Sequence, residues 1–224
     1  MLIHDWMTRG PIITLPDVSM MKVAKIMKEK NIRRLPVVDQ TGRLVGIITD
    51  RDIKEASPSK ATTLDVHELY YLLSEIKVKD IMTKDPIAVN ATDTVETAAL
   101  IMTNKRLGSL PVIDEHNKVI GIITDSDVFK VLIDITGVKH GGVQLGLELP
   151  NQTDALKQVI EDLTNADARI MSILTNIETL GAETRQAYIR IMKMERSLEN
   201  KIVEEIKNKY KLIYWARDRV HPLT

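Results

Sequence analysis

Apolar residues recur at intervals of three and four positions in two segments of the chain. The first segment holds Met20, Val23, Ala24 and Met27, and the second holds Val95, Ala98, Ala99 and Met102. This spacing predicts two helices, each with a single apolar stripe that must be buried. Asp17 and Thr92 precede the stripes, and their side-chain oxygens can accept from the free N–H groups of a first helical turn. We therefore expect the helices to begin near these two residues.

Short runs of β-branched residues follow each predicted helix and indicate hairpins. After the first helix, residues 35–38 and 44–49 are joined by Asp39-Gln40-Thr41-Gly42, whose Asp and Gly suit a turn. After the second helix, residues 114–118 occupy the corresponding place between two strands. Each half of this region is thus predicted to combine α-helices with a β-hairpin.

The pattern changes beyond residue 141. Alternating apolar residues at 143–149 predict a strand, and residues 156–163 have helical spacing. Two further strands are expected at 170–175 and 186–192, a helix capped by Ser197 runs to about Tyr210, and a last strand covers 212–215. This βαββαβ order is the ferredoxin-like topology.

The region before residue 136 contains two copies of one unit. Asp5-x-Met7-Thr8-x-x-Pro11, Leu35-Pro36-Val37 and Gly46-Ile47-Ile48-Thr49-Asp50-x-Asp52 all recur, beginning again at Asp80, Leu110 and Gly121. The displacement is the same for all three motifs, which indicates a duplicated unit. We predict a first repeat at 1–60, a linking helix at 61–78, a second repeat at 79–138 and a C-terminal domain at 142–218.

Composition argues against several classes of protein. The 31 Lys and Arg residues balance 31 Asp and Glu residues, and the aromatic residues are two Trp, five Tyr and one Phe. No net field therefore favours nucleic acid or an anionic membrane, and platforms for base stacking are few. Cysteine is absent, which excludes disulfides, Cys-bearing zinc sites and a thiolate nucleophile. Without a recognisable secretory signal or transmembrane run, we expect a cytoplasmic protein that binds neither nucleic acid nor membrane.

Sequence motifs of catalysis are missing. The five His residues form no His-x-x-Glu or His-Glu-x-x-His pattern, and neither a Gly-x-Ser-x-Gly elbow nor a Walker phosphate loop occurs. We therefore predict no metal site, no catalytic cofactor and no enzymatic activity.

The repeated motifs at 46–52 and 121–127, with the Leu-Pro-Val that precedes each, resemble the tandem CBS domain family, whose two repeats form a Bateman module. The element order of the C-terminal domain is similar to that of ACT-type regulatory domains. The complete arrangement resembles the bacterial AcuB-like acetoin-utilisation proteins. These resemblances imply an α/β (α+β) chain of two CBS repeats followed by a ferredoxin-like ACT-type domain.

The resemblance also implies a function. It implies a non-catalytic regulatory sensor whose tandem CBS module binds an adenine nucleotide or another adenosyl ligand, such as AMP, ADP, ATP or S-adenosylmethionine. Such a sensor would form a homodimer and signal to a partner protein, with acetoin utilisation as the process concerned. The alternative is a structural scaffold whose repeats no longer bind ligand and act through protein–protein contacts.

Candidate ligand-binding residues lie where strand gives way to helix in each repeat. The first-turn N–H groups and helix dipole favour anions beside Thr49, and the Asp52 carboxylate can accept both hydroxyls of a ribose. The family resemblance assigns sugar and phosphate contacts to these two residues and to their counterparts. The full set is Thr49, Asp50, Arg51, Asp52, Thr124, Asp125 and Asp127. The alternative is a capping box, in which the Thr and Asp side chains bond only each other's backbone.

Cations and apolar residues complete the candidate sites. Phosphate candidates are Arg33, Arg34 and Arg106, and adenine-pocket candidates are Ile12, Ile13, Pro36, Ile87, Ala88 and Pro111. Because Arg33-Arg34 aligns with Gly108-Ser109, and Arg51 with Ser126, the first motif should favour the more highly charged ligands. Sites assembled across the two repeats would alter this distribution, and the arginines could equally be solvated surface charges.

The C-terminal domain departs from the ACT pattern at one position. ACT domains that bind amino acids usually carry Gly in the first strand-to-helix turn, where this chain has Asp154. We therefore expect no amino-acid site, and a role in dimerisation or partner contact.

Overall fold

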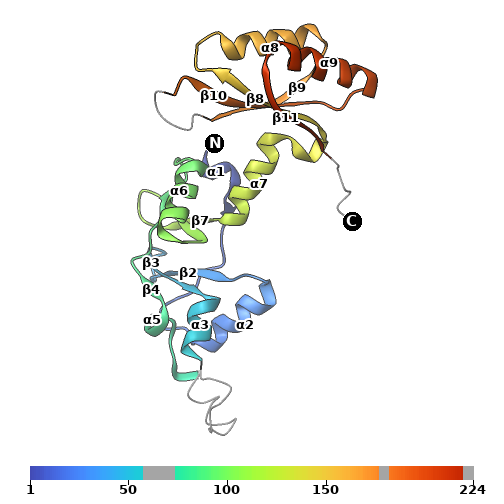
Figure 1. Cartoon of the computed structure of the whole chain (residues 1–224). Coiled ribbons are helices and arrows are strands. Elements are labelled where there is room, and N and C mark those ends of the chain that lie inside the picture. The colour runs from blue at the N-terminus through green and yellow to red at the C-terminus, as the bar shows by residue number, and fades with distance from the viewer. Residues whose placement is uncertain (58–73, 177–181, 219–224) are drawn as a thin grey trace. The chain divides into compact units, whose positions relative to one another are not determined.

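The chain divides into two compact units, residues 1–128 and 129–224. The computed structural model describes residues 1–57, 74–176 and 182–218 (Figure 1). Most of the linking helix expected at 61–78 lies outside the described residues.

Every element of the first copy in unit 1 recurs in the second copy at the displacement found in the sequence motifs. The first set is α1 (Ile3–Trp6), β1 (Thr8–Arg9), α2 (Met20–Lys30), β2 (Arg34–Val38), β3 (Leu44–Thr49) and α3 (Asp50–Ala56). The second set is α5 (Val78–Ile81), β4 (Thr83–Lys84), β5 (Val89–Asn90), α6 (Val95–Lys105), β6 (Ser109–Ile113), β7 (Val119–Thr124) and α7 (Asp125–Thr136). The counterpart of β5 is an isolated bridge from Thr14 to Val37. The mixed α/β character predicted for the repeats is confirmed.

The apolar stripes of α2 and α6 are buried, although each is narrower than predicted. The buried members are Met20, Val23 and Met27 in α2 and Val95, Ala98 and Met102 in α6. Ala24 and Ala99 are only partly buried. In the first copy the stripe packs against Leu35, Val37 and Ile48 of the hairpin, so helix and sheet share one core.

Both of these helices begin two residues later than expected. The Oγ of Ser19 accepts a hydrogen bond from an N–H group of the first turn of α2 at 3.4 Å, and Thr94 does the same for α6 at 3.1 Å. The expectation that Asp17 and Thr92 cap these helices was wrong. Asp17 instead forms an exposed ion pair with Lys79, with 2.7 Å between oxygen and nitrogen.

A two-residue strand from each copy completes the sheet of the other copy. β4 pairs antiparallel with β3, where Gly46 lies opposite Lys84, and β1 pairs with β7, where Gly121 lies opposite Arg9. The resulting sheets have the orders β2-β3-β4 and β1-β7-β6-β5. The copies are therefore joined by backbone hydrogen bonds, and each sheet contains strands from both.

A glycine makes each exchanged strand possible. A Cβ on Gly46 would lie 2.5 Å from the sulfur of Met82 and 3.1 Å from the carbonyl oxygen of Thr83. Gly121 stands in the same relation to Met7 and to the backbone of β1. Because each glycine lacks a side chain, the methionine that precedes the exchanged strand can occupy the space beside it.

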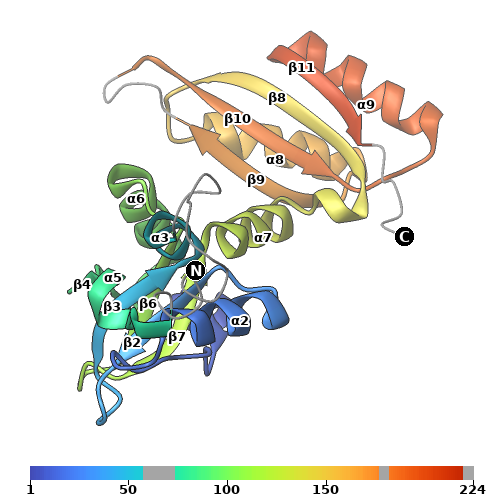
Figure 2. The ribbon, with the colours of Figure 1, turned by 90° about the horizontal axis from the view of Figure 1, so that it is seen from below.

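Unit 2 is a four-stranded antiparallel sheet covered by two helices on one face (Figure 2). A short 3-10 turn at Val138–His140 precedes β8 (Gly142–Pro150), α8 (Ala155–Asn165), β9 (Ile170–Asn176), β10 (Thr184–Ile191), α9 (Arg196–Lys209) and β11 (Lys211–Asp218). The strand order in the sheet is β11-β8-β10-β9. The βαββαβ order of elements is the one predicted.

The core of unit 2 lies between the helices and the covered face of the sheet. It contains Leu145 and Leu147 of β8, Val159 of α8 and Ile202 of α9, all nearly without exposure. This burial of one sheet face by amphipathic helices is what the alternation at 143–149 requires.

The first turn of α9 holds two polar features. Glu195, not Ser197 as predicted, caps the helix, because Ser197 already lies inside the first turn and its N–H donates to the Glu195 carboxylate at 3.3 Å. Glu199, whose side chain is 2% exposed, forms an ion pair with Arg217 of β11 at 2.6 Å. Since a buried carboxylate is costly without a partner, this pair ties the last strand to the helix.

Among the described residues, no helix combines the length and apolar character needed to cross a membrane.

We predict that Gly46→Ala lowers the free energy of unfolding by about 1 to 3 kcal/mol, the usual cost of overpacking. The added methyl group displaces Met82 and pushes on the backbone of β4. Urea unfolding of the parent and the variant measures the loss. In a Met82→Ala background the same substitution should cost clearly less, because the sulfur is gone. An equal cost in both backgrounds would show that the contact does not constrain the exchanged strand.

Candidate functional site

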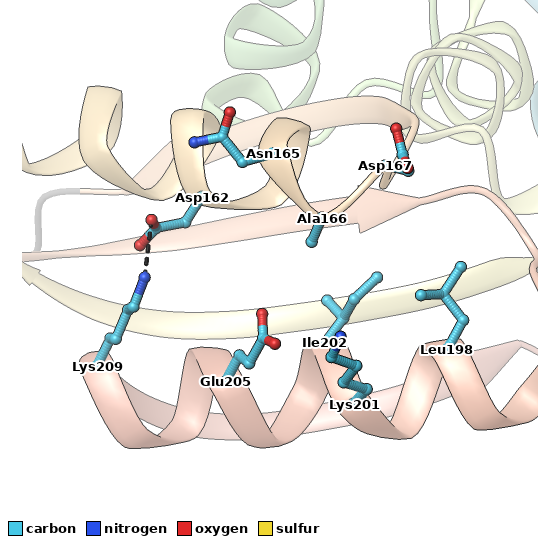
Figure 3. A pocket seen from close by; sticks show the side chains of 9 residues that line it. All are labelled: Asp162, Asn165, Ala166, Asp167, Leu198, Lys201, Ile202, Glu205 and Lys209. Carbon is cyan, nitrogen blue, oxygen red and sulfur yellow. Dashed lines mark hydrogen bonds and ion pairs between the residues drawn. The ribbon is translucent and has the colours of Figure 1, made fainter.

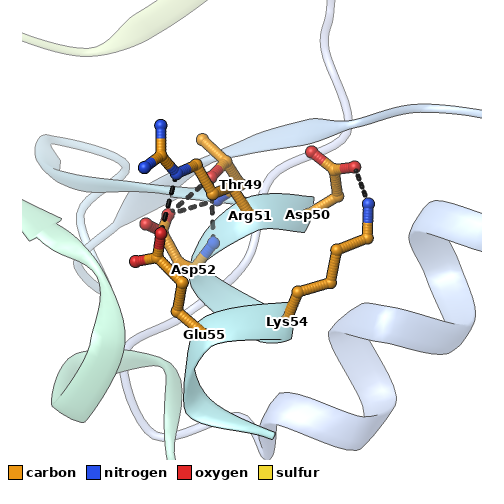
Figure 4. A network of polar contacts seen from close by, with 6 residues as sticks. All are labelled: Thr49, Asp50, Arg51, Asp52, Lys54 and Glu55. Atoms are coloured by element: carbon orange, nitrogen blue, oxygen red, sulfur yellow. Dashed lines mark hydrogen bonds and ion pairs between the residues drawn. The ribbon is translucent and has the colours of Figure 1, made fainter.

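The strand-to-helix junction at Thr49 is organised by hydrogen bonds to Asp52 (Figure 4). The backbone N–H and the Oγ1 of Thr49 donate to Oδ2 of Asp52 at 2.7 and 2.8 Å, and the Asp52 N–H donates back to Thr49 Oγ1 at 3.2 Å. The second copy repeats this with Thr124 and Asp127, at 3.1, 2.7 and 3.3 Å. The capping box weighed as an alternative is therefore present in both copies.

The capping box leaves part of the Asp52 carboxylate available. Both hydrogen bonds from Thr49 end on Oδ2, and within the described part of the chain Oδ1 of Asp52 accepts none. Asp52 also lines a cavity. Its carboxylate can thus hold the helix start and still accept from a bound hydroxyl group.

Neighbouring charges at this junction are already paired (Figure 4). Lys54 donates to Asp50 at 2.9 Å, and Arg51 donates to Glu55 at 2.7 Å. The hydrogen bond and charge of Lys54 lower the pKa of Asp50, and the charge of Arg33 lowers it further. Asp50 therefore remains a carboxylate and contributes negative charge beside the Thr49 turn.

The Thr49 turn faces residues of the other copy across a cavity of about 570 Å³. We call this cavity the Thr49 pocket. Ile87 and Pro111 of the second copy also line it. The exchange of β4 explains this arrangement, because the chain enters the sheet of the first copy at Thr83 and then continues directly into the pocket wall.

A second cavity, of about 580 Å³, combines the strand-to-helix junction of the second copy with residues of the first copy. This Thr124 pocket combines Thr124 and Asp125 with Ile12 and Pro36 of the first copy. Each of its lining positions has its counterpart, by the repeat alignment, in the lining of the Thr49 pocket. The duplication therefore produces two related sites, each built from both copies.

The two pockets differ in the number of charged residues that line them. The described cations lining the Thr49 pocket are Arg34, Arg51, Lys105 and Arg106, together with three carboxylates, Asp50, Asp52 and Asp85. Those lining the Thr124 pocket are Arg33 and Arg34, with Asp125 as the carboxylate. Asn31 and Ser126 of the Thr124 pocket occupy the places of Arg106 and Arg51.

The structure redistributes the residues that the sequence assigned to each motif. Ile12, Pro36 and Arg33 line the pocket of the Thr124 motif, whereas Ile87 and Pro111 line that of the Thr49 motif. Arg33 lines the Thr124 pocket, although it also lies beside the Thr49 turn, where its carbonyl accepts the N–H of Asp50 at 2.9 Å and its charge lowers the pKa of Asp50. The segments that follow the exchanged strands carry Ile12 and Ile87 to the turn of the other copy. Compared with the Thr124 pocket, the described lining of the Thr49 pocket has two more cations and two more carboxylates, so the predicted excess of positive charge beside Thr49 is not present.

Three candidates lie outside the pocket linings. Ile13 and Ala88 line neither cavity, and Asp127 is 5% exposed beneath Thr124 and lines neither. The pockets also contain lining residues that were not predicted, namely Lys105, Asp85 and Asn31. Asp85 and Asn31 adopt positive φ angles of 47° and 51°, and a backbone conformation of this kind is not marked by a motif in the sequence.

Unit 2 contains a smaller cavity of about 350 Å³ between α8 and α9 (Figure 3). Asp162 accepts hydrogen bonds from Nζ of Lys209 at 2.9 Å and from the hydroxyl of Tyr210 at 2.7 Å. Burial and this bond to Asp162 raise the pKa of Tyr210 to about 12. These contacts join the two helices, and among the described residues no cluster of His, Asp and Glu could hold a metal ion.

The turn before α8 lines a cavity of about 970 Å³ with Asn151, Asp154 and Gln158. Asp154 has φ −91° and ψ −13°, a conformation open to any residue, so the turn does not need the glycine that the ACT resemblance would place there.

A family model described as CBS domain matches residues 3–59 and 78–134. A CBS domain-containing protein of Dictyostelium discoideum is 33% identical over 134 residues, which cover 60% of this chain and 92% of that protein. The L-aspartate semialdehyde sulfurtransferase of Methanocaldococcus jannaschii is 32% identical over 130 residues, which cover 58% of this chain. The match spans only 23% of that enzyme.

Solved structures show the same relationship. The CBS-pair protein CBSX2 of Arabidopsis thaliana is 28% identical with a TM-score of 0.52, covering 60% of this chain and 95% of that chain. A structure of CBSX2 in complex with AMP is 30% identical with a TM-score of 0.50, covering 60% and 97%. A putative acetoin utilisation protein, AcuB, of Vibrio cholerae is 27% identical with a TM-score of 0.51, covering 62% and 95%.

We predict that Arg106→Gly raises the free energy of unfolding by about 0.5 to 1 kcal/mol, since glycine adopts a left-handed conformation without the cost that a side chain incurs. Arg106 ends α6 at φ 54°, and Asn31 ends α2 at φ 51°. Asn tolerates this conformation, so the matched control Asn31→Gly should gain less. Chemical unfolding of both variants decides the question. If only Arg106→Gly loses stability, the Arg106 side chain stabilises the fold by more than its left-handed backbone conformation costs.

Proposed function

Because this chain belongs to the CBS domain family, we propose that its two pockets bind adenosine-containing ligands and that the protein is a regulator without catalytic activity of its own. The observation that carries the proposal is the repeated combination of a Thr-Asp helix start, an apolar Ile-Pro wall and arginine side chains around one cavity. A nucleotide offers the matching parts, namely ribose hydroxyls, a flat apolar base and phosphate.

The ribose is assigned to Asp52 in the Thr49 pocket. Oδ1 of Asp52 is the acceptor that the capping box leaves available, and hydrogen bonds to a charged acceptor contribute about 1.5 to 3 kcal/mol each. Asp127 has the corresponding place beneath Thr124. In the Thr124 pocket we assign ribose contact to the Thr124–Asp127 turn as a whole.

The base and the phosphate are assigned to the apolar and the cationic lining residues of each pocket. Ile87 and Pro111 offer an apolar surface to adenine in the Thr49 pocket, and Ile12 and Pro36 do so in the Thr124 pocket. Phosphate would meet Arg51 and Arg106 in the first pocket and Arg33 in the second. Lys105 and Arg106 offer additional donors to the phosphates of ADP or ATP in the Thr49 pocket, whereas Asp52 and Asp85 offset their charge.

Regulation follows from the way the pockets are assembled. A ligand that contacts the Thr49 turn and the Ile87 wall at once joins the two copies, so binding stabilises one arrangement of unit 1 over others. We propose that unit 2, as an ACT-type domain, passes this change to a protein partner or assembles a homodimer. Its edge strand β11 exposes Ile213 and Trp215, at 47% and 45%, which supports a role in contact.

The process served is proposed from likeness alone. The similarity to the Vibrio cholerae protein supports acetoin utilisation as the first pathway to examine. The activity of the Methanocaldococcus jannaschii sulfurtransferase is not transferred to this chain, because the match spans less than a quarter of that enzyme.

We predict that AMP, ADP, ATP or S-adenosylmethionine stabilises the purified protein against heat, because a ligand at 100 times its dissociation constant adds about 2.7 kcal/mol. Asp52→Asn and Asp127→Asn should each reduce the stabilisation while leaving the unliganded protein folded. Glu115→Gln, at a side chain 88% exposed on a hairpin turn, is the matched control and should respond as the parent does.

Two outcomes would contradict the proposal. Full stabilisation in the Asp52→Asn and Asp127→Asn variants would remove the ribose assignment. No stabilisation by any adenosine ligand would favour the scaffold function, in which the capping boxes serve only the fold.

A further inference from the structure

Among the described lining residues, Arg34 alone belongs to both pockets. It begins β2, between Arg33 of the Thr124 pocket and the hairpin of the first copy. Its guanidinium reaches across to the second copy, where Nη1 donates to the carbonyl oxygen of Gly108. The same carbonyl accepts the N–H of Asp125, the first residue of α7, at 3.1 Å. One cation therefore stands at the helix start of the Thr124 pocket while also lining the Thr49 pocket.

The duplication supplies no second residue of this kind. The counterpart of Arg34 is Ser109, and the counterpart of Gly108 is Arg33. Gly108 is also what admits the guanidinium, since a Cβ there would lie 2.5 Å from Nη2 and 3.0 Å from Cζ of Arg34. The arrangement is thus a specific departure from the internal symmetry, placed between two cavities whose lining positions correspond.

We propose that Arg34 couples the two pockets, so that a phosphate bound in one weakens the binding of a phosphate in the other. This inference rests on the proposed function, because it requires nucleotide binding in both cavities. The guanidinium presents its donors as one planar fork that matches a single phosphate. A phosphate that draws this fork into the Thr49 pocket takes it from the Thr124 pocket, and the reverse holds equally because coupling is reciprocal.

The sign of the coupling follows from charge. Two phosphates that share one cation each gain less than a phosphate that has it alone, and their own charges repel each other. A charge-assisted hydrogen bond changes affinity by roughly 10- to 150-fold. The affinity of a pocket for AMP should therefore be lower by roughly tenfold or more when the other pocket already holds AMP than when it is empty.

Titration calorimetry of the full chain with AMP and with adenosine tests this. Asp52→Asn weakens ribose binding directly in the Thr49 pocket, and Asp127→Asn weakens it through the Thr124 turn, so each variant gives the affinity of the other pocket while its neighbour is unoccupied. The parent gives the affinity of each pocket when the other is filled. Adenosine is the matched ligand, because it carries no phosphate and cannot compete for Arg34.

We expect the parent to show the tenfold weakening with AMP but not with adenosine. In Arg34→Gln the loss of affinity for the second AMP should fall to less than about threefold. This is smaller than the change in affinity that one charged hydrogen bond produces. Lys25→Gln, on the exposed surface of α2 at 75% side-chain exposure, should retain the full weakening.

Equal weakening in Arg34→Gln and the parent would overturn the coupling, and so would equal weakening with adenosine and AMP. Two AMP molecules bound without any weakening would also overturn it while leaving the proposed function intact. Failure of the parent to bind either ligand would overturn the proposed function, and the coupling with it.

Discussion

The exchange of two-residue strands between the copies is the constraint on which unit 1 depends. β1 and β4 are too short to be stable alone, and each pairs with a strand of the other copy. Gly46 and Gly121 make this pairing possible by leaving room for Met82 and Met7. Because the exchanged segments continue into the pocket walls, the same hydrogen bonds that join the copies also decide which residues face which Thr-Asp turn.

Structure and ligand binding make compatible demands on the Thr-Asp pair. The capping box uses Oδ2 of Asp52 and fixes the start of α3, and this leaves Oδ1 directed by a rigid helix end. A carboxylate held in this way loses little conformational entropy when a ribose binds. The cap therefore fixes the carboxylate in position for ligand binding. In this way one short motif can serve both fold and function.

Much of the local structure could be predicted from the sequence, but the composition of the sites could not. The constant displacement between the repeated motifs predicted the repeated elements, and alternation at 143–149 predicted the βαββαβ unit, because these patterns report burial along one segment. Pairing of β1 with β7 joins segments from opposite ends of unit 1, which no local pattern reports. The division of Ile12 and Ile87 between the two pockets and the left-handed conformation of Arg106 could accordingly not be predicted.

A crystal structure of the full chain with AMP would show whether each site is built from both copies. We expect one AMP with its ribose hydroxyls on Asp52 and its adenine against Ile87 and Pro111. We expect a second AMP at Thr124 with its adenine against Ile12 and Pro36. An AMP whose ribose contacts Asp52 while its base lies against Ile12 and Pro36, within a single copy, would contradict this arrangement.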